Sequence, residues 1–232
     1  DYRLTDTYAE IENAQDYYTE KLYYLEDGFL CFEPLYDPGD VQPLPAKKNG
    51  YLTFGCFNNH KKVNENVIRV WSKILSCCPD SRLILKFNCS EDKVVREHFF
   101  SSFEKFGISR NRIEIYGHVE KSEHYKVYGK IDISLDPFPY NGTTTTFESL
   151  WTGVPALTLA GQRHSSRVSY SIQKRLGLDE FCCNNEEDYI AKCVSLADDI
   201  ERLAEIRSGL RQRIAESPLS DSKRFARTVE KA

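Results

Sequence analysis

Short apolar runs rich in β-branched and aromatic residues alternate with longer segments of helical periodicity in residues 51–176. Strands of about six residues separated by helices of about ten to fifteen favour a parallel sheet with helices on both faces. The sequence therefore predicts an α/β chain built on a doubly wound, Rossmann-like parallel sheet. Strands are expected at 51–57, 81–87, 112–117, 131–136 and 156–159, and helices at 64–78, 91–106, 122–130, 144–151 and 165–176.

The segments that flank this alternation have a different character. Residues 8–25 carry apolar side chains at helical spacing, which predicts a helix. Four prolines within residues 34–45 exclude a regular element there and indicate a linker. Residues 186–215 carry an apolar stripe at spacings of three and four, which predicts one long helix, and a final helix is expected over 222–231.

The charge balance excludes several classes of partner. With 31 basic and 35 acidic residues the formal net charge is −4, so the chain lacks the basic excess typical of proteins that bind nucleic acid or anionic membranes. No run of 18 apolar residues occurs, so no membrane span is expected. The chain contains no methionine, not even at its first position, and we therefore expect it to be part of a longer protein.

The eight cysteines do not form a recognisable metal or redox motif. The adjacent pairs Cys77–Cys78 and Cys182–Cys183 lack the spacer of a Cys-x-x-Cys unit, and no cysteine or histidine pair has zinc-finger spacing. We expect no metal site. Free buried thiols in a cytosolic or nuclear protein are the favoured interpretation, and disulfides are the alternative.

The segment after the fourth predicted strand is the strongest candidate for a ligand site, because ligands of open α/β sheets bind beyond the carboxyl ends of the strands. Two prolines and an Asn-Gly pair predict a rigid loop, and residues 143–146 then place four threonines where a helix begins. A helix N-terminus with added hydroxyls can hold a diphosphate. Glu148 follows closely enough to accept hydrogen bonds from ribose hydroxyls. The alternative is a capping run without a ligand. No Gly-x-Gly-x-x-Gly or Walker motif occurs.

Three other strand ends carry candidate side chains. Residues 58–62 follow the first predicted strand, and Lys62 there can neutralise a departing phosphate, although a solvated loop is the alternative. His124 follows the third strand and can stack on a base or ribose, or it is structural. His164, Ser165 and Arg167 follow the fifth strand and can meet a sugar or phosphate, or they begin an ordinary helix. No Ser-His-Asp set or catalytic carboxylate pair can be assigned.

The stretch from Asp132 to Gly161 carries a resemblance to a known family, in the letters DISLDPFPYNGTTTTFESLWTGVPALTLAG. It closely resembles the C-terminal catalytic lobe of the O-GlcNAc transferase and SPINDLY family of protein glycosyltransferases. A second match is FGCFNNHKKVNENVIRVWSKIL over residues 54–75, and a third is SPL over 217–219. The resemblance covers essentially the whole chain.

This resemblance implies the C-terminal, donor-binding lobe of a GT-B glycosyltransferase. The N-terminal lobe and tetratricopeptide repeats of such an enzyme would precede residue 1. The implied division is an inter-lobe helix and proline-rich linker (1–49), a nucleotide-sugar-binding lobe (50–185) and C-terminal helices that pack on it (186–232). The implied reaction is an inverting transfer of a sugar to Ser or Thr of proteins, without a metal or a cofactor other than the nucleotide-sugar donor, in a cytoplasmic or nucleocytoplasmic protein.

Motif position also assigns roles by resemblance. Lys62 matches the catalytic lysine that binds the diphosphate and assists its departure. Glu148 matches an acidic residue that holds the ribose. The remaining residues that the resemblance assigns to nucleotide-sugar binding are Asn59 in the same loop as Lys62, Lys121 and His124 beside the nucleoside, and Thr143, Thr144 and Thr145 at the phosphates.

Two questions about function stay open at this point. Thr143 and Thr146 give the loop a form that resembles SPINDLY-type and bacterial members more than animal O-GlcNAc transferases. UDP-GlcNAc is therefore the expected donor, with GDP-fucose, the donor of the plant SPINDLY type, as the alternative. The chain could also be a nucleotide-binding or scaffolding module without transfer activity, or part of a transferase with a non-protein acceptor.

Overall fold

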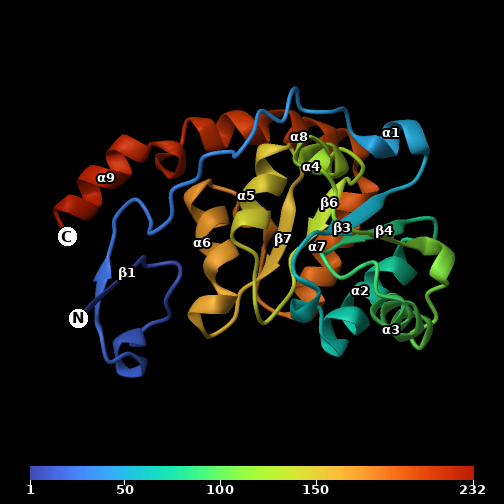
Figure 1. Cartoon of the computed structure of the whole chain (residues 1–232), viewed down its shortest axis with the longest axis horizontal. Helices are drawn as coiled ribbons and strands as arrows, with labels where there is room; N and C mark the ends of the chain where they lie inside the picture. Colours follow the sequence, from blue (N-terminus) through green and yellow to red (C-terminus); the bar gives the residue numbers. More distant parts are fainter.

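The computed structural model describes the backbone of residues 1–232 and every side chain except those of Lys121 and Ser122. Within this described chain, six parallel strands form the central sheet, in the order β5–β4–β3–β6–β7–β8 (Figure 1). The doubly wound parallel sheet predicted from the sequence is therefore confirmed. The strands are β3 (Thr53–Cys56), β4 (Arg82–Lys86), β5 (Ile113–Tyr116), β6 (Ile133–Leu135), β7 (Ala156–Leu159) and β8 (Cys182–Cys183).

Helices cover both faces of this sheet, and the side chains of β4 show how. Leu83 and Leu85 pack in one apolar cluster with the helices α2 (Glu65–Cys77) and α3 (Lys93–Glu104), whereas Ile84 between them packs with Tyr125 of α4 (Lys121–Tyr128) in a second cluster. This alternation is what a strand buried on both faces requires. The helices of the lobe are α2 (Glu65–Cys77), α3 (Lys93–Glu104), α4 (Lys121–Tyr128), α5 (Thr144–Trp151) and α6 (Val168–Arg175).

The predicted strands and helices within residues 51–176 are confirmed, with ends that differ by a few residues. Asn64 caps α2 by accepting a hydrogen bond from the Val67 amide, as its position before the helical stripe predicted. The sixth strand, β8, was not predicted. Two residues are too short for a periodic signal, and only the pairing with β7 defines the strand.

The predicted helix over residues 8–25 is wrong. This segment forms a 3-10 turn (Ala14–Tyr17) and the strand β2 (Lys21–Tyr24), which pairs in parallel with β1 (Tyr2–Thr5). The Asp6 carboxylate accepts hydrogen bonds from the Tyr8 and Ala9 amides and so replaces the helical hydrogen bonds there. Strand pairing with β1 therefore overrides the helical spacing of the apolar residues.

The single long helix predicted over residues 186–215 is also wrong. The chain forms α7 (Glu186–Asp198) and α8 (Ile200–Ala215), separated at Asp199. Asp199 leaves the helical conformation, and its carboxylate accepts from the Arg202 amide as the N-cap of α8. Both helices pack on the lobe and share its main apolar cluster.

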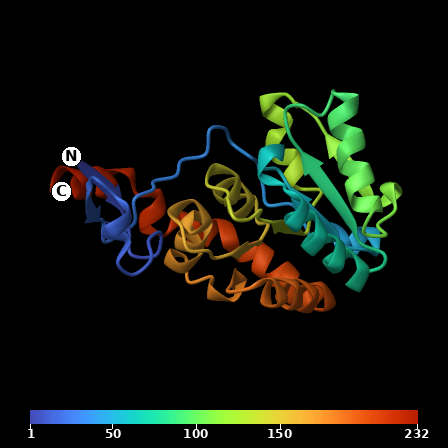
Figure 2. The ribbon, with the colours of Figure 1, turned by 90° about the horizontal axis from the view of Figure 1, so that it is seen from below.

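The two chain ends lie at the same end of the molecule. The final predicted helix is confirmed as α9 (Ser222–Glu230), and the remaining helix is the short α1 (Pro45–Asn49) after the proline-rich segment. Residue 1, the β1–β2 pair and α9 lie close together in both views (Figures 1 and 2). All eight cysteines are free thiols. Among the described residues, none of the helices has the length and apolar character needed to cross a bilayer.

Candidate functional site

The strand order changes direction between β3 and β6, and open α/β sheets bind ligands in a crevice at that position. The chain runs outward from β3 to β4 and β5, then returns to β6 on the other side of β3. The segments that follow these two neighbouring strands diverge, which opens a ligand site at their carboxyl ends. One is the 3-10 turn His60–Lys62, and the other is the loop over residues 136–143 that leads into α5.

The buried carboxylate of Asp136 holds the loop over residues 136–143 in place. Its Oδ1 accepts from the Gly142 amide at 2.6 Å, and its Oδ2 accepts from the Thr158 hydroxyl at 2.8 Å. Burial raises the pKa of Asp136 to about 6, although these hydrogen bonds and the charge of Lys62 act in the opposite direction. The buried side chain of Asp136 thus anchors the loop to Thr158 of β7.

A second set of hydrogen bonds fixes the start of α5. The Ser169 hydroxyl donates to the Gly142 carbonyl at 2.9 Å, so the Thr146 hydroxyl, 2.8 Å away, donates to Ser169. Thr143 occupies the N-cap position without a side-chain hydrogen bond to the helix. The first amides of an α-helix have no partner within it, so this end of α5 presents free N–H donors to an anion.

Lys62 reaches this same point from the segment after β3. Its Nζ donates to the Asn141 carbonyl at 2.6 Å and lies 3.4 Å from Oδ1 of Asn58. The same Oδ1 accepts from the Thr145 hydroxyl at 3.0 Å. Burial lowers the pKa of the Lys62 ammonium, and the nearby Asp136 carboxylate raises it. A half-buried cation and the N-terminus of α5 therefore converge in the crevice.

Glu148, one turn further along α5, and His124 of α4 form a second part of the site. Glu148 is buried, and its Oε2 accepts from the Tyr128 hydroxyl at 3.1 Å and lies 3.1 Å from Nε2 of His124. Burial and the charge of Glu148 raise the pKa of Tyr128 well above its ordinary value, so the phenol remains a hydrogen-bond donor. The Glu148 carboxylate is thus held by Tyr128 in the same helix whose N-terminus Lys62 approaches.

The structure brings most of the predicted site residues together. Lys62 and Thr145 contact the same Asn58 oxygen, Thr143 is the N-cap of α5, and Glu148 of the same helix lies beside His124.

The remaining predicted site residues are Thr144, Lys121 and Asn59. Thr144 opens α5 with an exposed side chain, and the side chain of Lys121 lies outside the described residues. Asn59 is exposed, and its side chain caps the His60–Lys62 turn by accepting from the Lys61 amide at 3.0 Å.

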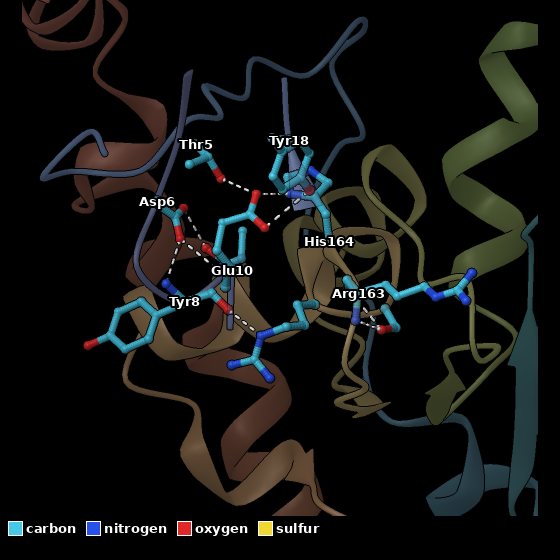
Figure 3. Close-up of polar contacts among 11 residues, drawn as sticks. Thr5, Asp6, Tyr8, Glu10, Tyr18, Arg163 and His164 are labelled. Carbon is cyan, nitrogen blue, oxygen red and sulfur yellow. Dashed lines mark hydrogen bonds and ion pairs between the residues drawn. The ribbon is translucent and has the colours of Figure 1, made fainter. Parts of the chain in front are cut away.

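His164 and Arg167, two of the predicted candidates after β7, contact the N-terminal segment. They therefore do not face an open ligand position. Nδ1 of His164 lies 2.7 Å from the buried Glu10 carboxylate, which also accepts from Thr5 and Tyr18 (Figure 3). Arg167 donates to the Tyr8 carbonyl. Ser165 contributes its carbonyl, which accepts from the Asn141 amide and so braces the loop over residues 136–143.

Sequence reasoning missed three residues of the site: Asn58, Lys86 and Tyr128. Asn58, not its neighbour Asn59, provides the oxygen that contacts both Lys62 and Thr145. Lys86 ends β4 with its Nζ 3.2 Å from Nδ1 of His124. A charged residue at the carboxyl end of a buried strand was a signal for Lys86. Tyr128 gave none, because its position in the sequence resembles that of an ordinary core residue.

Two other kinds of chemistry, a thiolate nucleophile and a metal centre, are not supported in this region. Burial raises the pKa of the Cys56 thiol, at the end of β3, to about 12, so this cysteine is not a thiolate nucleophile. The part of the chain with described side chains contains no group of three or more His, Cys, Asp or Glu residues that would hold a metal ion.

The Gly142→Ala variant is expected to be less stable than the wild type and to have a displaced N-terminus of α5. A Cβ at this position would lie 2.6 Å from the hydroxyls of both Thr145 and Thr146, so the start of α5 must shift. We expect a loss of about 1–3 kcal/mol in the free energy of unfolding, measured by urea denaturation. Gly209→Ala in α8 is the matched control, because nothing lies within 4 Å of its Cβ. It should gain up to about 1 kcal/mol from helix propensity. Equal losses for both variants would contradict the assignment.

Comparisons with known proteins agree with this architecture. The sequence profile of glycosyl transferase family 41 matches residues 44–229. Two proteins named probable UDP-N-acetylglucosamine–peptide N-acetylglucosaminyltransferase SPINDLY are similar along nearly the whole chain. The tomato protein (Solanum lycopersicum) is 41% identical over 99% of the chain, and the Petunia hybrida protein is 40% identical over 99%. The chain spans about a quarter of the length of these curated relatives, 25% in both cases.

A solved structure shows the same relationship in three dimensions. The K341M mutant of the O-GlcNAc transferase from Thermobaculum terrenum superposes with a TM-score of 0.90 over 99% of this chain and 43% of that chain, at 31% sequence identity. The predicted fold, a Rossmann-like lobe of a GT-B glycosyltransferase, is confirmed by this match. Because the profile covers most of the chain and the structural match includes the crevice between β3 and β6, the chain belongs to glycosyl transferase family 41.

Proposed function

We propose that the crevice between β3 and β6 binds a nucleotide sugar, and that the protein transfers GlcNAc from UDP-GlcNAc to Ser or Thr hydroxyls of proteins. The observation that carries this proposal is the convergence of the Lys62 ammonium with the N-terminus of α5, where Nζ donates to the Asn141 carbonyl at 2.6 Å. The names of the tomato and Petunia relatives support UDP-GlcNAc as donor and a peptide as acceptor.

The proposed mechanism is electrostatic stabilisation of the leaving nucleoside diphosphate. Negative charge develops on the diphosphate as the bond to the sugar breaks, and a fixed cation and helix N–H groups lower the energy of that charge. In this proposal Lys62 and the first turn of α5 stabilise that charge. Glu148, which accepts from Tyr128 at 3.1 Å, would accept hydrogen bonds from the ribose. In this proposal the protein supplies the positive charge, so no metal is required.

Further parts of the proposal concern the longer protein. An acceptor-binding lobe and tetratricopeptide repeats preceding this chain would account for the length of the relatives. Residues 1–49 would connect the lobes, residues 50–185 would bind the donor and residues 186–232 would pack on that lobe. We place the protein in the cytoplasm or nucleus, where its protein acceptors would be found.

Titration calorimetry with UDP and with GDP tests the proposal on the chain itself. We expect UDP to bind and GDP to bind at least about tenfold more weakly, a difference of about 1.4 kcal/mol. Preference for GDP would instead support GDP-fucose as the donor, as in SPINDLY-type O-fucosyltransferases. Binding of neither nucleotide would overturn the donor-site assignment. Glu148→Gln, which keeps the shape of the side chain, should weaken binding by about tenfold.

A further inference from the structure

Lys86 lies inside the proposed nucleotide site but has no part in the mechanism above. It is the half-buried last residue of β4, and its Nζ lies 3.2 Å from Nδ1 of His124 and 6.0 Å from the centre of the Phe57 ring. Burial lowers the pKa of Lys86, and the Glu148 carboxylate raises it. The ammonium is therefore held among an imidazole, an aromatic ring and a carboxylate rather than in solvent.

The contact between Lys86 and His124 determines where the imidazole carries its proton. An ammonium has donors only, so Nδ1 must accept through its lone pair. A neutral imidazole whose Nδ1 accepts carries its proton on Nε2. This Nε2 is buried and makes no hydrogen bond to any residue with a described side chain, yet Oε2 of Glu148 lies 3.1 Å away. Nε2 therefore lies beside Glu148 without a hydrogen bond to it, and it has no partner among the described side chains.

The groups around His124 come from three elements. Lys86 faces it from β4 and Glu148 from α5, while Tyr125 and Tyr128 of its own helix pack edge-on against the ring. Oε2 of Glu148 receives the Tyr128 hydroxyl as well, whereas Oε1 accepts no hydrogen bond from the described side chains. One carboxylate oxygen is thus engaged within the protein, and the other has no hydrogen-bond partner among the described side chains.

We propose that Lys86 is a positioning residue of the nucleotide site: through its contact with Nδ1 it fixes the ring of His124 beside Glu148, whose Oε1 would then accept from a ribose hydroxyl. This inference rests on the proposed function for its ligand. Lys86 acts through His124 and does not itself contact the nucleotide.

A double-mutant cycle measured by titration calorimetry with UDP and GDP tests this indirect role. Lys86→Met is expected to weaken nucleotide binding by about tenfold, because the charged hydrogen bond that orients His124 is lost. In a His124→Gln background the same change should have less than about a twofold effect. Lys86→Arg, which keeps a cationic donor, should restore most of the affinity. Lys126→Met removes an exposed lysine from α4 that pairs with Glu123, and it should bind as the wild type does.

Nitrogen NMR of the histidine side chains gives a readout that a merely structural role would not change. The chain has five histidines, so the His124 signal can be assigned from the His124→Gln variant. In the wild type we expect the tautomer with its proton on Nε2, because Nδ1 accepts from Lys86. In Lys86→Met the Nδ1 signal should lose the shift of a hydrogen-bonded acceptor.

Each outcome of these experiments decides the inference. A wild-type spectrum with a proton on Nδ1, or additive effects of the two substitutions in the cycle, would overturn it. Additivity would mean that Lys86 contacts the nucleotide directly. If the wild type binds neither UDP nor GDP, the proposed function fails, while the NMR spectra still decide whether Lys86 controls His124. If Lys86→Met does not fold, Lys86→Arg and the wild-type spectrum remain decisive.

Discussion

Lys62→Ala is expected to slow sugar transfer by about a hundredfold to a thousandfold in the full-length protein. Removing one preorganised group that stabilises developing negative charge typically costs this much. The loss should appear mainly in kcat, because the charge on the leaving diphosphate is greatest in the transition state. Steady-state kinetics with UDP-GlcNAc and a protein acceptor would measure it.

Lys61→Ala provides the matched control for this experiment. Lys61 lies in the same 3-10 turn and carries the same charge, but its side chain is exposed, whereas Nζ of Lys62 contacts the Asn141 carbonyl. The control should transfer sugar at close to the wild-type rate. If Lys62→Ala also retained the wild-type rate, the assignment of Lys62 to the leaving group would be wrong.

Asp136→Ala is expected to lower the free energy of unfolding by roughly 3 kcal/mol. The carboxylate is fully buried and accepts from the Gly142 amide and the Thr158 hydroxyl, and its removal leaves both donors unsatisfied. The loop over residues 136–143 would also lose its anchor, so nucleotide binding should weaken in the same variant. Urea denaturation and calorimetry measure the two effects.

Asp136→Asn separates the hydrogen bonds of this side chain from its charge. The amide oxygen can still accept from Gly142, so the loss of stability should be much smaller than for Asp136→Ala. The pKa of Asp136 is raised from 3.8 to about 6 in the folded protein. A raised carboxyl pKa favours folding at low pH, and this contribution is lost as the pH rises from about 4 through 6.

The comparison with the wild type should therefore depend on pH. Between pH 4.5 and pH 7, the wild type is expected to lose about 2 kcal/mol of stability that Asp136→Asn retains, because asparagine does not titrate. Asp132, whose pKa burial also raises to about 6, is present in both proteins, so its effect cancels. A stability difference between them that stays constant with pH would contradict the burial of a titrating carboxylate at this position.

The core of the fold was predictable because its signals are local. The apolar runs of β3 to β7 and the stripes of the helices between them depend on residues a few positions apart, as does the capping of α2 by Asn64. The predictions that failed involve competing interactions. Pairing of β2 with β1 overrides the helical spacing in residues 8–25, and the carboxylate of Asp199 ends one helix and begins the next.

The site was predictable as a region, because parallel strands bring their carboxyl ends to one edge of the sheet. That rule alone placed Lys62, Thr145 and Glu148 near each other, although more than 80 residues separate the first two. It did not say which of two adjacent asparagines faces the crevice. Asn59 caps a turn, whereas Asn58 contacts Lys62 and Thr145.

By itself, then, the sequence determined the α/β class, the parallel sheet, the threonine-rich start of α5 and the residues that carry the family resemblance. Only the tertiary structure decided the strand order, the anchoring of the loop by Asp136 and the meeting of Lys86 with His124 and Glu148. The reason is physical. Periodicity and capping involve neighbours along the chain, whereas the direction of a side chain at a strand end depends on which strands and helices pack beside it.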